Sequence, residues 1–129
     1  MAVTVKTNDQ STNFPSYITL DDLEDTVVAD ILTGTTGSVY SIIIENENGT
    51  SGTEAYVHLY DNLSPTVGAG GSAQEMKLRN RNSAAVARVT HCFIRYGHAF
   101  SVGCSAAASK ASDASDDPDF TTNVIILGD

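Results

Sequence analysis

The sequence lacks several kinds of residue, and each shortage excludes a class of protein. Tryptophan is absent from the 129 residues, and 7 lysines and arginines stand against 16 aspartates and glutamates. A formal net charge of −9 is poorly suited to nucleic acid or an anionic membrane, since phosphate binding needs clustered basic residues. No apolar run approaches the ~20 residues that span a bilayer. The N-terminus has neither a basic lead nor an apolar core, so we expect no signal peptide.

Motifs that carry chemistry are also missing. The only two cysteines, Cys92 and Cys104, lack the close pairing of structural zinc ligands, and they fit a chain made in a reducing cytoplasm. No G-x-S-x-G elbow occurs. The glycine-rich stretches 34–37 and 68–71 lack the Lys-Ser/Thr ending of a phosphate loop. We therefore expect no enzyme and no cofactor.

The histidines and one acidic loop leave two metal hypotheses open. His58, His91 and His98 do not have the spacing of metal ligands. We therefore favour the interpretation that the cysteines are buried thiols and the histidines lie on polar faces, over a metal site. The acidic loop contains Asp113, Asp116, Asp117 and Asp119. Clustered carboxylates suit calcium, but the central glycine and closing glutamate of an EF-hand are absent. A solvated loop is favoured over a calcium site.

The sequence is rich in β-strand patterns separated by turn residues. The expected strands are Thr26–Leu32, Ser38–Glu45, Glu54–Asp61, Glu75–Asn82, Ala84–Ile94, Phe100–Ser109 and Asn123–Leu127. Such spacing predicts an all-β protein, an antiparallel β-sandwich or jelly roll of about 7–8 strands. Thr19 and Asp22 are expected to cap a short helical turn, and residues 95–98 are expected to form a turn around Gly97.

The domain organisation follows from the polar start of the chain. Residues 1–17 are expected to form an extended N-terminal arm, and residues 18–129 a single β-sandwich or jelly-roll domain. In assemblies such arms often pack on a neighbour. Phe14 and Tyr17 are therefore the arm residues expected to make protein contacts.

Charge is distributed unevenly. Residues 1–65 contain ten acidic side chains and one basic one, whereas residues 66–129 contain six of each. The basic residues concentrate in one stretch, as Lys77, Arg79, Arg81, Arg88 and Arg95. Alternation predicts Lys77, Arg79 and Arg81 on one side of one strand. This stretch is interpreted as ordinary surface charge or as a protein interface that meets an acidic surface.

Five short phrases stand out along residues 38–127: SVYSI at 38–42, ENEN at 45–48, YVHLYD at 56–61, SPTVG at 64–68 and GHAFS at 97–101. In these phrases the chain resembles small virion proteins of tailed bacteriophages. The family shows an LYSI-x-I-x-N strand, a Y-x-K-LYD strand, an SPTVG loop and a GLAFSTG stretch. This chain departs from the pattern at His58, where lysine is common, and at His98, where leucine is common.

The resemblance implies a non-enzymatic decoration or cement protein that binds the major capsid protein on the capsid surface. It also implies self-association as a homotrimer. Two alternatives stay open. One is a tail, fibre or baseplate component. The other is a carbohydrate-binding β-sandwich, with Tyr56, Tyr60 and Tyr96 as an aromatic platform.

Overall fold

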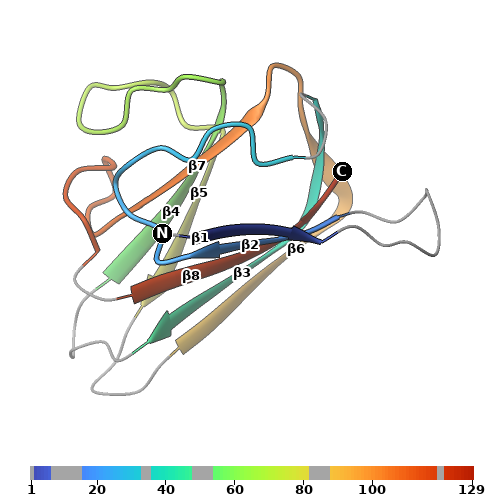
Figure 1. Cartoon of the computed structure of the whole chain (residues 1–129). Helices are drawn as coiled ribbons and strands as arrows, with labels where there is room; N and C mark the ends of the chain where they lie inside the picture. The colour runs from blue at the N-terminus through green and yellow to red at the C-terminus, as the bar shows by residue number, and fades with distance from the viewer. Residues whose placement is uncertain (1, 7–15, 33–35, 48–53, 82–87, 119–120) are drawn as a thin grey trace.

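Eight β-strands form two antiparallel sheets in the computed structural model, which describes residues 2–6, 16–32, 36–47, 54–81, 88–118 and 121–129. The strands are β1 (Ala2–Lys6), β2 (Ser16–Asp21), β3 (Gly37–Glu47), β4 (Glu54–Asp61), β5 (Met76–Arg81), β6 (Arg88–Phe100), β7 (Cys104–Ser109) and β8 (Thr121–Gly128). The larger sheet has the order β1-β2-β8-β3-β6 and the smaller sheet β5-β4-β7 (Figure 1). The expected all-β sandwich-like class is confirmed. None of the described residues forms a helix long and apolar enough to cross a membrane.

The strand pairings are nested within one another. At the centre β4 pairs with the next strand, β5, and β3 then pairs with β6 around it. Further out, Val28 bridges Ala106 in β7, and β2 pairs with β8. All these pairings are antiparallel, so the chain runs as a doubled ribbon that passes repeatedly between the two sheets. Its distant ends, β2 and β8, therefore become neighbours.

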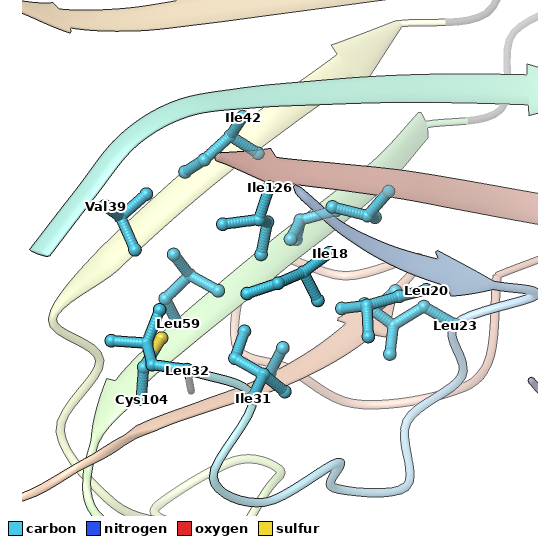
Figure 2. Close-up of a cluster of buried hydrophobic side chains, with 14 of the residues drawn as sticks. Ile18, Leu20, Leu23, Ile31, Leu32, Val39, Ile42, Leu59, Cys104 and Ile126 are labelled. Atoms are coloured by element: carbon cyan, nitrogen blue, oxygen red, sulfur yellow. The ribbon is translucent and has the colours of Figure 1, made fainter. Parts of the chain in front are cut away.

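Side chains from both sheets meet in one hydrophobic core. In β8 the buried residues alternate with half-buried ones, so Val124 and Ile126 point inward while Ile125 points outward. In β4 Val57 and Leu59 point into the same core. Figure 2 shows Leu59 and Ile126 gathered with side chains of the segment after β2, including Leu23 and Leu32. Apart from Phe100 and Cys104, the buried residues of this core are valine, isoleucine, leucine and alanine.

The segment 26–32 does not form the strand expected from its β-rich composition. It forms a single bridge, in which Val28 and Ala106 exchange backbone hydrogen bonds of 2.8 and 2.9 Å. Asp30 then adopts a positive φ of 52°, which turns the chain and interrupts the ladder. The helical turn expected at Thr19 is also wrong, because Thr19 lies within β2.

The turn expected at residues 95–98 is instead a bulge inside the long strand β6. Val39 pairs with His98 while Ser41 pairs with Phe93, so residues 94–97 lie opposite Tyr40 alone. Gly97 adopts a φ of 75°, and a Cβ there would meet the Tyr40 ring at 2.7 Å. The glycine thus marks a real irregularity, but β3 keeps the chain in the sheet.

The described parts of the expected N-terminal arm lie in the larger sheet. β1 pairs with β2 from Ala2 opposite Asp21 to Lys6 opposite Tyr17. β2 pairs in turn with β8. Residues 7–15, with Phe14, lie outside the described residues. An N-terminal arm over residues 1–17 that packs on a neighbour stays a prediction.

Asp61 joins the end of β4 to the turn between β6 and β7. Its Oδ2 accepts hydrogen bonds from the backbone N–H and the hydroxyl of Ser101, at 3.0 and 2.9 Å. Its Oδ1 accepts from the N–H groups of Val102 and Gly103, at 2.7 and 3.1 Å. The backbone donors of Ser101 and Val102 are the main reason that the pKa of Asp61 falls to about 2.

Replacement of Asp61 by alanine is expected to lower the free energy of unfolding by about 1–2 kcal/mol, because the donors of this turn lose a partly exposed charged acceptor. The folded pKa lies below that of the unfolded chain. The stabilisation is therefore present above about pH 4 and is lost as the pH falls toward 2. Urea unfolding at pH 7 and pH 3 measures both effects. Asp21→Ala, at the exposed end of β2, is the control; equal losses in the two variants would contradict the prediction.

Candidate interaction surface

The face of the larger sheet that points away from the core carries exposed apolar side chains. Directly paired residues of an antiparallel sheet share a face, so the register defines this outer face. Two rows of paired residues cross it: Tyr17, Leu127, Ser41 and Phe93 in one, and Thr19, Ile125, Ile43 and His91 in the other. The outer face therefore extends across four strands and mixes aromatic, aliphatic and polar side chains.

Strand β6 contributes the most exposed apolar residues of the larger sheet: Val89 and Phe93 on the outer face, and Tyr96 in the bulge. The exposed fractions are 63% for Val89, 72% for Phe93 and 81% for Tyr96. β6 is also the last strand of the sheet order, and no strand of the described chain pairs with its far side (Figure 1). A long edge strand with large exposed apolar side chains favours association with another protein surface.

Polar groups on the outer face are placed at distinct positions along β6. Near its middle, Ser41 Oγ and His91 Nε2 lie 2.7 Å apart in a hydrogen bond. In the bulge, the Arg95 guanidinium lies 5.1 Å from the centre of the Tyr96 ring, within cation–π range. At the start of β6, Val89 pairs with Glu45 of β3. A carboxylate therefore lies beside the start of β6, and a guanidinium lies in the bulge near the middle of the strand.

The predicted basic stripe lies on the smaller sheet. Arg79 forms an ion pair with Glu54, whose Oε2 accepts a 2.7 Å hydrogen bond from the Tyr56 hydroxyl. Lys77 donates to the backbone carbonyl of Ser112 at 3.3 Å. These two basic groups therefore interact with their own chain, which reduces the charge available to a partner.

The other predicted interface residues lie on different parts of the molecule. Tyr17 and Arg95 belong to the larger sheet. The backbones of Arg81 and Arg88 lie in β5 and β6, but their side chains are outside the described residues, as is Phe14. The structure thus distributes the predicted set over two sheets and does not bring it together. The most exposed apolar residues of β6 were not among the predicted interface residues.

The aromatic platform expected for a carbohydrate-binding protein does not form. The rings of Tyr56, His58 and Tyr60 follow one another along β4, with centroids 6.3 and 6.5 Å apart. His58 and Tyr60 are buried, and burial raises the pKa of Tyr60. Tyr96 lies in the other sheet. The three tyrosines therefore present no common surface to a sugar.

The acidic loop is organised by local hydrogen bonds. Asp113 Oδ1 accepts from the N–H and hydroxyl of Ser115, at 3.0 and 2.6 Å, and these bonds lower the pKa of Asp113. Asp117 Oδ1 accepts from the N–H of Asp25 at 2.9 Å, and a hydrogen bond with the Asp117 side chain raises the pKa of the Asp25 carboxyl. Asp119 lies outside the described residues. Within the described ranges, no three histidine, cysteine, aspartate or glutamate side chains are grouped to hold a metal ion.

Both cysteines are free thiols. Cys104 is fully buried, and burial raises the pKa of its thiol to about 12. Cys92 is half-buried and packs against the core from β6. Because the thiolate is the reactive form, Cys104 is an inert core residue at neutral pH.

Comparison with known proteins gives no relative from which a function can be transferred. No protein-family model, curated protein or solved structure matches this chain.

Proposed function

We propose that this chain is a non-enzymatic structural protein of a phage virion, a capsid decoration protein that binds the major capsid protein and stabilises the shell. The observation that carries the proposal is the outer face of the larger sheet, with exposed Val89 and Phe93 beside a free strand edge. Such a surface is suited to a protein partner and is costly to leave in water. The resemblance of residues 38–127 to phage virion proteins supports a capsid protein as the partner.

The strand connectivity supports this assignment at the level of fold. The nested pairings, from β4–β5 at the centre to β2–β8 outside, are those of a jelly roll, with residues 26–32 in the place of its shortest strand. Jelly rolls occur in viral capsid domains, but also in lectins and cupins. The fold therefore agrees with a virion role without specifying it.

The surroundings of the Ser41–His91 pair support a non-enzymatic role. A serine hydrolase needs such a pair, but it also needs free N–H groups that stabilise an oxyanion. Ser41 pairs with Phe93 of β6 on one side and with Leu127 of β8 on the other, next to the bulge at Tyr40. The pair thus lies within the sheet and is better explained as a polar contact on the outer face.

The proposal predicts that the chain is found on the shell of purified particles, with a copy number comparable to that of the major capsid protein. Quantitative mass spectrometry of particles measures the copy number, and image reconstruction locates the density. A copy number far below that of the shell protein would contradict the capsid role and indicate a tail component. Absence from particles would contradict any virion role.

A substitution on the outer face can be tested by measuring how the variant binds to shells that were prepared without this chain. Tyr17→Glu introduces a charge on the outer face at a side chain 42% exposed, so weaker shell binding is expected with little loss of stability. Leu63→Glu is the matched control, because Leu63 is 38% exposed on the loop after β4. Equal shell binding by the two variants would show that Tyr17 is not part of the contact.

A further inference from the structure

We propose that residues 110–118, the loop after β7, form a cover over the smaller sheet that is closed while the His58 ring is neutral and opens in acid. The covered face is the side of this sheet that points away from the core, since Val57 and Leu59 point into it. The register places six residues of β4 and β7 on the covered face: Tyr56, His58, Tyr60, Ser105, Ala107 and Ser109. All except Tyr56 are buried, although the larger sheet lies on the opposite side.

His58 contacts both loops that flank the covered face. Ser109 Oγ donates to the carbonyl of Ala111 at 2.7 Å, so it accepts from His58 Nε2, which lies 2.7 Å away. On the other side of the ring, Nδ1 lies 2.8 Å from Gln74 Oε1, in the loop before β5. An amide side chain can present either its oxygen or its nitrogen to a ring, so Gln74 suits a neutral and a charged imidazole alike. Hydrogen bonding therefore does not decide which form the closed cover favours.

Burial decides in favour of the neutral ring. The imidazole is fully buried between the rings of Tyr56 and Tyr60, with centroids 6.3 and 6.5 Å away. Burial is the largest cause that lowers the pKa of His58, and Lys77, which pairs with it from β5, lowers it further. A proton thus binds more readily once water reaches the ring. Acid therefore shifts the population toward an open state.

The groups that act in the opposite direction are weaker. The Gln74 hydrogen bond raises the pKa of His58, and so does the charge of Asp113 in the loop after β7. The Asp113 carboxylate is exposed and accepts two hydrogen bonds from Ser115, so water and these donors weaken its attraction for the ring. From β7 the ring faces Ala107, which has no charge. The net effect of all these neighbours is still a lowered pKa for His58.

The loop before β5 stays anchored in acid. At its start the Asn62 carbonyl accepts a 2.5 Å hydrogen bond from Ser105 Oγ. At its end the N–H of Glu75 donates to the Leu59 carbonyl at 2.8 Å, and Glu75 Oε1 lies 2.7 Å from His98 Nε2. That contact becomes an ion pair when His98 is protonated, so acid strengthens it. The opening therefore takes place on the other side of His58.

The loop after β7 is held less firmly. Lys77 Nζ donates to the Ser112 carbonyl at 3.3 Å, and the N–H of Asp25 donates to Asp117 Oδ1 at 2.9 Å; both contacts are exposed. Within the loop, Ala114 is buried and adopts a φ of 66°, which strains any residue that has a Cβ. Exposed contacts and a strained backbone are typical of segments that open locally, before the rest of the fold.

The test is the exposure of tyrosine to water at pH 7 and pH 5, measured by second-derivative ultraviolet absorbance of the full chain. Tryptophan is absent, and a tyrosine with a pKa of about 10 or above does not titrate in this range. We expect a shift toward the spectrum of exposed tyrosine in acid, while far-ultraviolet circular dichroism keeps the β-sheet signal. Tyr60→Phe should remove most of this shift. An unchanged spectrum, or a shift that coincides with loss of the sheet signal, would overturn the proposal.

Two histidine variants identify the group that titrates. His58→Gln cannot take up a proton and should lose the tyrosine shift. His91→Gln, at an exposed position of the other sheet, is the matched control and should keep the shift. Equal shifts in the two variants would exclude His58 as the cause.

Asp113→Asn provides a test that leaves the buried ring in place. Asparagine keeps an acceptor for Ser115 but removes the charge that favours a protonated His58 under the closed cover, so opening should move to a higher pH. Asp21→Asn, on the larger sheet, should leave the opening pH unchanged. Opening of Asp113→Asn at the natural or a lower pH would contradict the proposal. All these measurements use the isolated chain, so their outcome is independent of the proposed capsid role.

Discussion

Replacement of Ile126 by alanine is expected to lower the free energy of unfolding by about 3–4 kcal/mol, whereas Ile125→Ala is expected to cost about 1 kcal/mol. The two residues are neighbours in β8, and alternation places them on opposite faces. Ile126 is fully buried beside Ile18 and Ile42 (Figure 2), where loss of its side chain leaves a cavity between the sheets. Ile125 is half-buried on the outer face, where water can fill the space.

Urea unfolding followed by far-ultraviolet circular dichroism measures both variants without a tryptophan signal, which this chain lacks. The two variants have the same composition and the same change in strand propensity, because the substitution is identical and the positions are adjacent. A difference between them therefore reports the difference in burial. Similar losses at the two positions would mean that the outer face is covered in the free chain. A larger loss at Ile125 would mean that β8 pairs one residue out of register.

Strands whose signals are local were predicted well from the sequence. The β-branched run at 38–45 is β3, which extends from Gly37 to Glu47, and the alternating run at 54–61 is β4 with the same bounds. In β5, Met76 and Leu78 pack against the core as alternation predicts, which places Lys77 and Arg79 on the other face. These features depend only on residues that are close together in the chain, so they can be predicted from a single sequence.

Features that depend on distant pairing were not predicted. Residues 26–32 have strand composition, but their partner Ala106 lies far along the chain and the positive φ of Asp30 interrupts the ladder. From the sequence, Gly97 predicts a turn at residues 95–98. In the structure β3 holds both sides of this glycine in one sheet, because Val39 and Ser41 pair on either side of the bulge. Propensity alone contains no information about such a partner.

The apolar part of the outer face was missed for a related reason. In β6 the outward residues Val89 and Phe93 alternate with Cys92 and Ile94, which pack against the core. Both sets are apolar, so a period of two does not distinguish the buried face from the exposed one. The basic residues were more conspicuous in the sequence. The structure instead pairs Arg79 with Glu54, a residue of the neighbouring strand.

His58 shows how a polar-face prediction fails when loops cover a sheet. It points away from the core on β4, yet it is fully buried. Its Nε2 lies 2.7 Å from Ser109 Oγ, and that hydroxyl donates to the carbonyl of Ala111 at 2.7 Å. Ser109 Oγ therefore accepts from Nε2, and the other ring nitrogen, Nδ1, lies 2.8 Å from Gln74 Oε1. The imidazole thus joins the loop before β5 to the loop after β7.

Replacement of His58 by alanine is expected to destabilise the chain by about 3 kcal/mol, through a cavity and two lost hydrogen bonds. Burial is the main cause that lowers the pKa of His58; nearby Lys77 also lowers it, while the Gln74 hydrogen bond and Asp113 raise it. The unfolded chain therefore binds a proton more readily than the folded one. Stability should be full above about pH 6.5 and fall as the pH drops below that value.

His58→Gln separates this titration from the loss of packing, because glutamine keeps hydrogen-bonding groups but does not titrate. Its free energy of unfolding should change less between pH 7 and pH 5 than that of the natural chain. His91→Gln, at an exposed position on the outer face, should keep the natural pH dependence. If His91→Gln reduced the pH dependence and His58→Gln kept it, the acid sensitivity would belong to the outer face. Acidification would then act on the surface proposed to bind the capsid, and not on the loops that His58 joins.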